Sequence, residues 1–210
     1  MLPRVLQTTA WKEMGRRLRI RVGEPPQTVH GLRQGGELDI ALVYQMGQSG
    51  LAWPHTLHRQ WVGDDLFKVV LPRGWGMSDG ARMSATQLTE MPWIMHHPGT
   101  SDATVIERLF ASCNLHPQVV AYSDDFNASL ALTGAGLGAS LVPELVLRNS
   151  REKFVVVDVP EIRLARRIFA LRMQENSQDQ GSANTDNSDE TVAGLFVDLL
   201  ANAFAEAVAD

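Results

Sequence analysis

The stretch from Pro92 to Asp102 constrains the fold most strongly, because it leads from a strand into a helix through one sharp turn. The apolar run at residues 92–95 ends in two histidines, and Pro98-Gly99 then breaks the chain. Three favourable helix N-cap residues follow: Thr100, Ser101 and Asp102. Apolar side chains then recur at helical spacing: Val105, Ile106, Leu109, Phe110 and Cys113. A strand that turns directly into a helix is typical of α/β proteins.

Strands and helices alternate in this way along most of the chain, which indicates an α/β fold. We expect strands at residues 18–22, 38–44, 66–71, 93–95, 119–122, 139–142, 154–159 and 167–173. We expect helices at residues 2–12, 27–34, 84–88, after Thr100, after Asp125, and from Val192 to Phe204. Leu18, Ile20 and Val22 alternate with arginines, a pattern typical of a half-buried strand. The run 38–44 is almost continuously apolar, which favours a parallel strand covered on both faces.

The order of these elements predicts two lobes. Lobe I comprises residues 1–66 and 164–210, and lobe II comprises residues 67–163. Residues 174–190 contain no large apolar side chain, so we expect them to form a mobile polar loop within lobe I. Because the chain would cross between the lobes twice, the lobes would form a hinged pair. A cleft between two α/β lobes is a common place for a small ligand.

Composition excludes several classes of protein. The net charge of −5 argues against direct binding of this chain to nucleic acid. No apolar run approaches the 18 residues typical of a transmembrane helix, so we expect no membrane partner. The single cysteine excludes an intrachain disulfide, and residues 1–4 do not resemble a signal peptide. These features predict a cytoplasmic protein.

A series of motifs follows the order found in one family: Leu2-Pro3, Gly36–Val43, Leu66–Pro72, Pro92-Trp93-Ile94 and Gly134–Glu144. Taken together over roughly residues 1–173, they resemble the effector-binding domain of LysR-type transcriptional regulators. The resemblance implies two Rossmann-like lobes, a type 2 periplasmic-binding-protein-like fold, and a small-molecule effector between the lobes. It also implies a homodimer that contacts DNA through a winged helix-turn-helix domain. This chain lacks that domain and the family's first strand.

Three loops should face the effector, by resemblance and by position. They supply Glu24 and Thr28, then Tyr44 and Gln45, and finally His96, His97, Gly99, Thr100 and Ser101. Asn127, at another helix N-terminus, is a further candidate. Hydroxyl groups beside free helix N–H groups suit a carboxylate, so the effector could be an organic anion. An ordinary N-cap role for Thr100 or Ser101 is about equally favoured.

Other kinds of site are less well supported. His96 and His97 are adjacent, so their side chains should point in opposite directions in an extended chain. The sequence offers no further metal ligand at a suitable spacing from them, so we predict no metal site. Gly134, Gly136 and Gly138 follow a helix and precede a strand, the reverse of a dinucleotide-binding motif, so we predict no cofactor. No nucleophile–base set can be named, so we predict no enzyme activity. The alternative to an effector-sensing domain is a free-standing solute-binding protein of a transport system.

Overall fold

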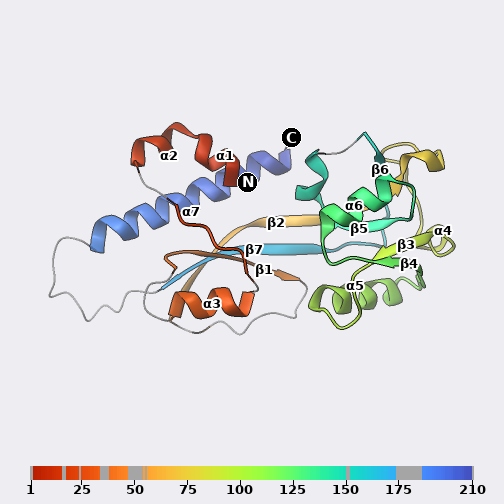
Figure 1. Ribbon diagram of the computed structural model, residues 1–210, viewed down its shortest axis with the longest axis horizontal. Helices are drawn as coiled ribbons and strands as arrows, with labels where there is room; N and C mark the ends of the chain where they lie inside the picture. The colour runs from red at the N-terminus through yellow and green to blue at the C-terminus, as the bar shows by residue number, and fades with distance from the viewer. Residues whose placement is uncertain are drawn as a thin grey trace. The chain divides into compact units, whose positions relative to one another are not determined.

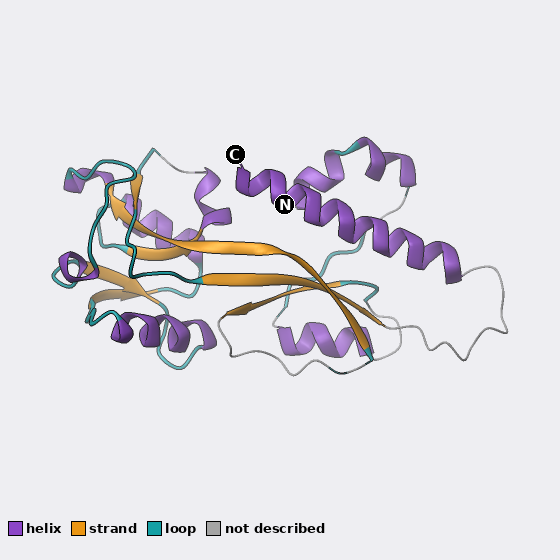
Figure 2. Cartoon of the chain, turned by 180° about the vertical axis from the view of Figure 1, so that it is seen from behind, coloured by secondary structure: helices purple, strands orange, loops and turns teal. Residues whose placement is uncertain are grey.

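The computed structural model describes residues 2–15, 18–23, 25–33, 38–46, 54, 56–149, 152–173 and 186–209 (Figure 1). The chain forms two compact units: unit 1 is Met1–Asp64 with Arg167–Asp210, and unit 2 is Asp65–Arg166. Two strands carry the chain across the boundary, β2 (Leu57–Pro72) and β7 (Ala165–Met173). They are neighbours in a sheet of order β1-β7-β2-β5, in which β6 also pairs with β2 (Figure 2).

Unit 1 has two apolar clusters. The helix α3 (Pro25–Arg33) packs on β1 (Ala41–Met46), where Leu32, Val43 and Leu171 are buried together (Figure 1). In the second cluster, α1 (Leu2–Gln7) and α2 (Thr9–Met14) contact α7 (Asp186–Ala209). The expected helix over residues 2–12 is interrupted at Thr8, because its hydroxyl accepts the Trp11 N–H at 3.2 Å and starts a new helix.

Two predictions for unit 1 were wrong. Residues 18–23 form no strand, and the side chains of Leu18, Ile20 and Val22 are 38, 59 and 98% exposed. No strand within the described residues pairs with this segment, and alternation alone does not stabilise a strand without a neighbour. The predicted polar loop extended too far, because α7 already begins at Asp186. The remainder of that loop, residues 174–185, lies outside the described residues.

The strand β2 starts nine residues earlier than expected, since Gly63, Asp64 and Asp65 indicated a turn. The structure gives other reasons for these residue types. A Cβ atom on Gly63 would lie 2.2 Å from the Phe204 ring of α7, so only glycine allows this close approach. Asp65 is fully buried and pairs with Arg166. Tertiary contacts therefore override the local turn signal.

Unit 2 combines an antiparallel and a parallel arrangement of strands. The end of β2 pairs with β5 (Ser140–Pro143) on one side and with β6 (Phe154–Val157) on the other. A separate parallel pair is formed by β3 (Pro92–Met95) and β4 (Gln118–Tyr122). The remaining elements are η1 (Arg73–Trp75), α4 (Ala85–Leu88), α5 (Ser101–Ser112), α6 (Phe126–Gly134) and η2 (Glu144–Asn149).

Close packing fixes α5 and β5 against the parallel pair. The fully buried Trp93 ring meets Phe110 of α5 edge-on, with 4.9 Å between ring centroids. Ile94 donates its backbone N–H to the Ala139 carbonyl oxygen at 2.8 Å, and a Cβ atom on Gly138 would lie 2.8 Å from the Pro92 oxygen. The glycine at this position is therefore explained by its close packing against β3.

Candidate functional site

The carboxyl edge of the parallel pair β3 and β4 brings two helix N-termini together. β3 continues through residues 96–100 into α5, and β4 continues through residues 123–125 into α6. Because the strands are parallel, both connections leave the same edge of the pair. Thr100 caps α5 and Asp125 caps α6, through bonds from the Ala103 and Ala128 N–H groups. The chain thus presents two positively polarised helix ends on one side of unit 2.

Asp124 ties the two connections to each other. Its Oδ1 accepts the His97 backbone N–H at 2.9 Å, and its Oδ2 lies 3.0 Å from Nδ1 of the same histidine. Oδ1 also lies 3.5 Å from Nδ1 of His96. The hydrogen bond from the His97 N–H is the main cause that lowers the pKa of Asp124 below its ordinary value of 3.8. This carboxylate therefore stays ionised and holds the loop of the two histidines.

The two histidines have different environments. The His96 side chain is 7% exposed and meets the Phe126 ring edge-on, with 4.9 Å between centroids. The His97 side chain is 58% exposed and lies beside Tyr122, with 5.6 Å between centroids. Their contrasting exposure agrees with the expectation for neighbours in an extended segment. His97 is therefore the histidine that a ligand can reach.

Thr100 acts as an N-cap. Its hydroxyl donates to the His97 carbonyl oxygen at 3.1 Å and accepts the Ala103 N–H at 3.2 Å. Ser101 is exposed, and its hydroxyl has no hydrogen-bond partner among the described residues. Gly99 has a φ of +91°, a conformation that L side chains rarely adopt, so the turn before α5 favours glycine. Of the two hydroxyls, that of Ser101 is the one available to a ligand.

Phe126 connects this edge to a buried ion pair. Its ring lies 5.8 Å from the Phe67 ring and 5.8 Å from the guanidinium carbon of Arg166. Nε and Nη2 of Arg166 lie 2.9 and 2.8 Å from Oδ2 of Asp65, and Oδ1 of Asp65 accepts the Leu145 N–H at 3.0 Å. Burial raises the pKa of Asp65, and the Arg166 guanidinium opposes that effect. Asp65 and Arg166 are the first and last residues of unit 2, so this pair joins the two chain crossings.

The predicted site residues fall into two groups. The structure brings His96, His97, Gly99, Thr100, Ser101 and Asn127 to the same edge of unit 2. Thr28 lies in α3, and Tyr44 and Gln45 lie within β1, all in unit 1. Glu24 lies outside the described residues. As effector contacts, all of these residues stay predictions.

Sequence reasoning missed the roles of Asp124, Asp65 and Arg166. Asp124 had a usable signal, because an acidic residue directly after a strand and before a helix N-cap often lies at a functional edge. Asp65 and Arg166 are 101 residues apart, and neither stands in a motif. Only the tertiary structure brings these two side chains together.

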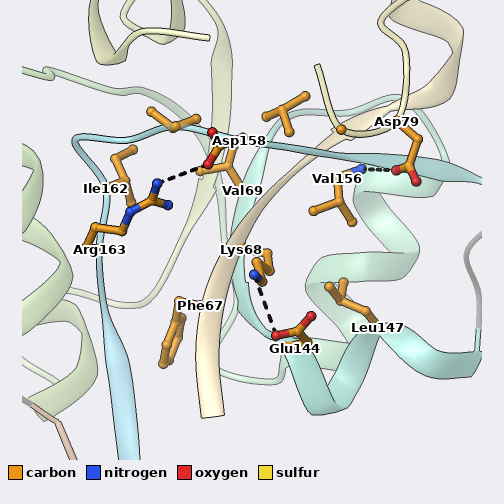
Figure 3. Close-up of a pocket in the computed structure, with 13 residues that line it drawn as sticks. Phe67, Lys68, Val69, Asp79, Glu144, Leu147, Val156, Asp158, Ile162 and Arg163 are labelled. Atoms are coloured by element: carbon orange, nitrogen blue, oxygen red, sulfur yellow. Dashed lines mark hydrogen bonds and ion pairs between the residues drawn. The ribbon is translucent and has the colours of Figure 1, made fainter. Parts of the chain in front are cut away.

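A cavity of about 230 Å³ also lies in unit 2 (Figure 3). Its lining includes Lys68, Asp79, Glu144, Val156, Asp158 and Arg163, and it contains none of the predicted site residues. Among the described residues, no three histidine, cysteine or acidic side chains could share a metal ion. Over the same residues, no helix is both long and apolar enough to cross a membrane.

Comparison with known proteins gives one family and one fold. The family model for the LysR substrate binding domain matches residues 1–183. No curated protein matches the chain. Among solved structures, the Synechocystis PCC6803 CcmR regulatory domain in complex with 2-PG is 19% identical, with a TM-score of 0.69. That match covers 96% of this chain and 90% of the CcmR chain.

Two similar structures are longer chains. HinK, a LysR family transcriptional regulator from Pseudomonas aeruginosa, is 24% identical with a TM-score of 0.71, over 96% of this chain and 64% of its own. An H2O2-bound mutant of Corynebacterium glutamicum OxyR is 19% identical with a TM-score of 0.71, over 99% and 62%. The chain therefore spans less than two thirds of these proteins. At such identities the matches establish the fold, which is the predicted type 2 periplasmic-binding-protein-like fold.

Proposed function

Because the chain belongs to the LysR substrate binding domain family, we propose that it senses a small organic effector and passes that signal to transcription control. The family assignment is the observation that carries the proposal. Two of the similar structures hold small ligands, 2-PG in one and H2O2 in the other. Domains of this family are generally not enzymes, and the proposal gives this chain a sensing role without catalysis.

The proposed effector contacts in unit 2 are Ser101, His97 and the N-terminal turns of α5 and α6. The Ser101 hydroxyl is exposed and unpaired among the described residues, and the His97 side chain is 58% exposed. Two helix N-termini and these two groups favour a carboxylate. The nearby Asp124 carboxylate would repel an anion, but its two oxygens already face the histidines. Thr28, Tyr44 and Gln45 remain proposed contacts in unit 1.

Effector binding at this edge has a physical route to the chain crossings. His96 contacts Phe126, Phe126 lies under Arg166, and Arg166 pairs with Asp65. A ligand that moves the loop of His96 and His97 would shift this series of contacts. We propose that the pair at the crossings responds to the effector, which is how a sensing domain can change shape.

We also propose that the chain forms a homodimer and reaches DNA through a domain outside this chain. The structure of full-length CbnR with its target DNA is one of the similar structures. In unit 2, β4 lies beside β3 alone among the described strands, and Val119, Val120 and Tyr122 are 39, 49 and 48% exposed. An exposed apolar strand edge of this kind suits a second copy of the chain. Control of transcription implies a cytoplasmic location.

A thermal-shift screen of small aliphatic and aromatic carboxylic acids tests the proposal, because a ligand that binds only the folded state must raise the melting temperature. We expect at least one acid to raise it in proportion to concentration. Ser101→Ala should weaken the binding of that acid about 10- to 100-fold, the usual effect of removing a hydrogen bond to a charged group. Ser112→Ala, an exposed position at the C-terminal end of α5, is the control. If no acid stabilises the chain, or if Ser101→Ala binds the acid equally well, the proposed edge is wrong.

A further inference from the structure

The cavity of Figure 3 exists because one strand leaves the sheet early. The pairing of β6 with β2 ends at Val157 and Val69. The chain next bonds to β2 at Leu164, whose carbonyl oxygen accepts the Phe67 N–H at 2.8 Å. Residues 158–163 bend away between these two points. The bend leaves an opening of about 230 Å³ beside Phe67, Lys68 and Val69. Pockets for drug-sized ligands begin at roughly 300 Å³, so this opening suits only a shorter molecule.

The lining of this cavity combines an aliphatic surface with separated charges. Val156, Leu147 and Ile162 provide the aliphatic part. Glu144 of η2 lies 3.6 Å from the Lys68 ammonium, and Asp158 lies 3.1 Å from the Arg163 guanidinium. Figure 3 shows these two pairs coming from different segments around the opening. A ligand with an apolar body and one charged end would match both features.

The charges that line the cavity indicate whether the charged end of a ligand should be positive or negative. Three carboxylates, of Asp79, Glu144 and Asp158, line the cavity with two cations, of Lys68 and Arg163. Asp79 uses one oxygen to accept the Val156 N–H at 2.8 Å. Within the described residues, the other oxygen of Asp79 and of Asp158 has no partner, and Glu144 meets only Lys68. The lining can therefore accept further hydrogen bonds from a cation.

We propose that this cavity is a second small-molecule site, which binds a short aliphatic ammonium compound with its charge at Glu144 and its chain on Val156 and Leu147. Glu144 and Lys68 are the best buried of the charged groups, with side chains 26 and 32% exposed. An ion pair at this position is therefore less screened by water than one at Asp158 or Arg163, which are 45 and 66% exposed.

The site lies next to the ion pair at the chain crossings. Leu145, the neighbour of Glu144, donates its N–H to Asp65, and the negative charge of Glu144 helps to raise the pKa of Asp65. A cation bound at Glu144 would offset this negative charge close to Asp65. The site shares no residue with the proposed effector edge, so a failure of either proposal leaves the other unaffected.

Isothermal titration of the 210-residue chain with n-pentylamine, pentan-1-ol and pentanoate tests the proposal. The three compounds share a chain length and differ in charge. We expect pentylamine to bind with a dissociation constant on the order of 1 mM, which is reasonable for a ligand of this size. Pentan-1-ol measures the apolar part alone and should bind several-fold more weakly. Pentanoate should bind most weakly, because the lining carries three carboxylates against two cations.

Two matched variants locate the binding. Glu144→Gln should lower the affinity for pentylamine about 5-fold, which is the largest effect expected from losing a partly exposed ion pair. Glu107→Gln removes the same charge from the exposed face of α5 and should leave the affinity unchanged. Melting temperatures confirm that both variants fold. The proposal is overturned if pentylamine shows no binding at concentrations up to about 50 times the expected dissociation constant. It is also overturned if pentanoate binds as tightly as pentylamine, or if both variants lower the affinity for pentylamine equally.

Discussion

The Asp124 carboxylate makes the stability of the site loop depend on acid pH. Its pKa in the folded chain is lowered, chiefly by the His97 N–H, so its stabilising effect is present above the ordinary value of 3.8. As pH falls through the lowered pKa, protonation removes that effect. We predict that wild type loses more stability than Asp124→Asn between neutral pH and pH values below about 3.8.

Urea unfolding at both pH values measures the difference. The effect should be below about 1 kcal/mol, because Asp124 is half-exposed and water screens its contacts. Asp39→Asn, on an exposed side chain before β1, is the control and should follow wild type. Identical losses for wild type and Asp124→Asn would show that the carboxylate does not hold the loop.

The buried pair of Asp65 and Arg166 should be costly to break. Asp65 is fully buried, and Asp65→Asn removes the carboxylate charge that faces the Arg166 guanidinium at 2.8 Å. We predict a loss of about 3 kcal/mol in the free energy of unfolding. The double variant Asp65→Asn with Arg166→Met removes both charges and should recover part of that loss. Equal stability of the single and double variants would contradict a coupled pair.

These residues show what a sequence can reveal at this scale. Thr100 as an N-cap and the contrasting environments of His96 and His97 follow from local rules of helix capping and strand alternation. The pairing of Asp65 with Arg166 depends on two segments 101 residues apart. Because charges along the sequence do not specify their tertiary partners, this part of the site could not be predicted from sequence.

Among the elements, β2 and α7 depend on one glycine. A Cβ atom at Gly63 would lie 2.2 Å from the Phe204 ring, so Gly63→Ala must displace the ring or the helix. We predict a loss of about 1 to 3 kcal/mol in unfolding free energy, typical of overpacking. Gly74→Ala is the matched control, because its Cβ atom would meet nothing within 4 Å. Denaturant unfolding of both variants measures this loss. Equal stability of Gly63→Ala and Gly74→Ala would contradict the close packing at Gly63.

Most strands and helices could be predicted because their apolar spacing agrees with their final environment. α5 and the core of β2 at Val69, Val70 and Leu71 are examples. Residues 18–23 show the limit of the method. Their alternation fits a strand, but a strand also needs a hydrogen-bonded neighbour, which the described residues do not supply. The alternation of apolar residues in a segment does not show whether a partner strand lies beside it.

For the whole molecule, the exposed edge of β4 predicts self-association. Val120 is 49% exposed on this strand, so Val120→Lys places a charge on the apolar edge without disturbing a core residue. We predict that wild type sediments as a dimer and Val120→Lys as a monomer. Lys153→Glu, an exposed change in the segment before β6, should not alter the mass. A monomeric wild type at about 100 μM would exclude this interface, since stable interfaces persist at such concentrations.

The central claim is that an effector binds at the edge formed by α5 and α6 of unit 2. Amide NMR spectra of the chain, recorded with the acid that gives the largest thermal shift, test it most directly. We predict that the changed resonances cluster at Gly99–Asp102 and Asp124–Asn127. Changes confined to other residues, with those two segments unperturbed at saturating acid, would contradict the claim.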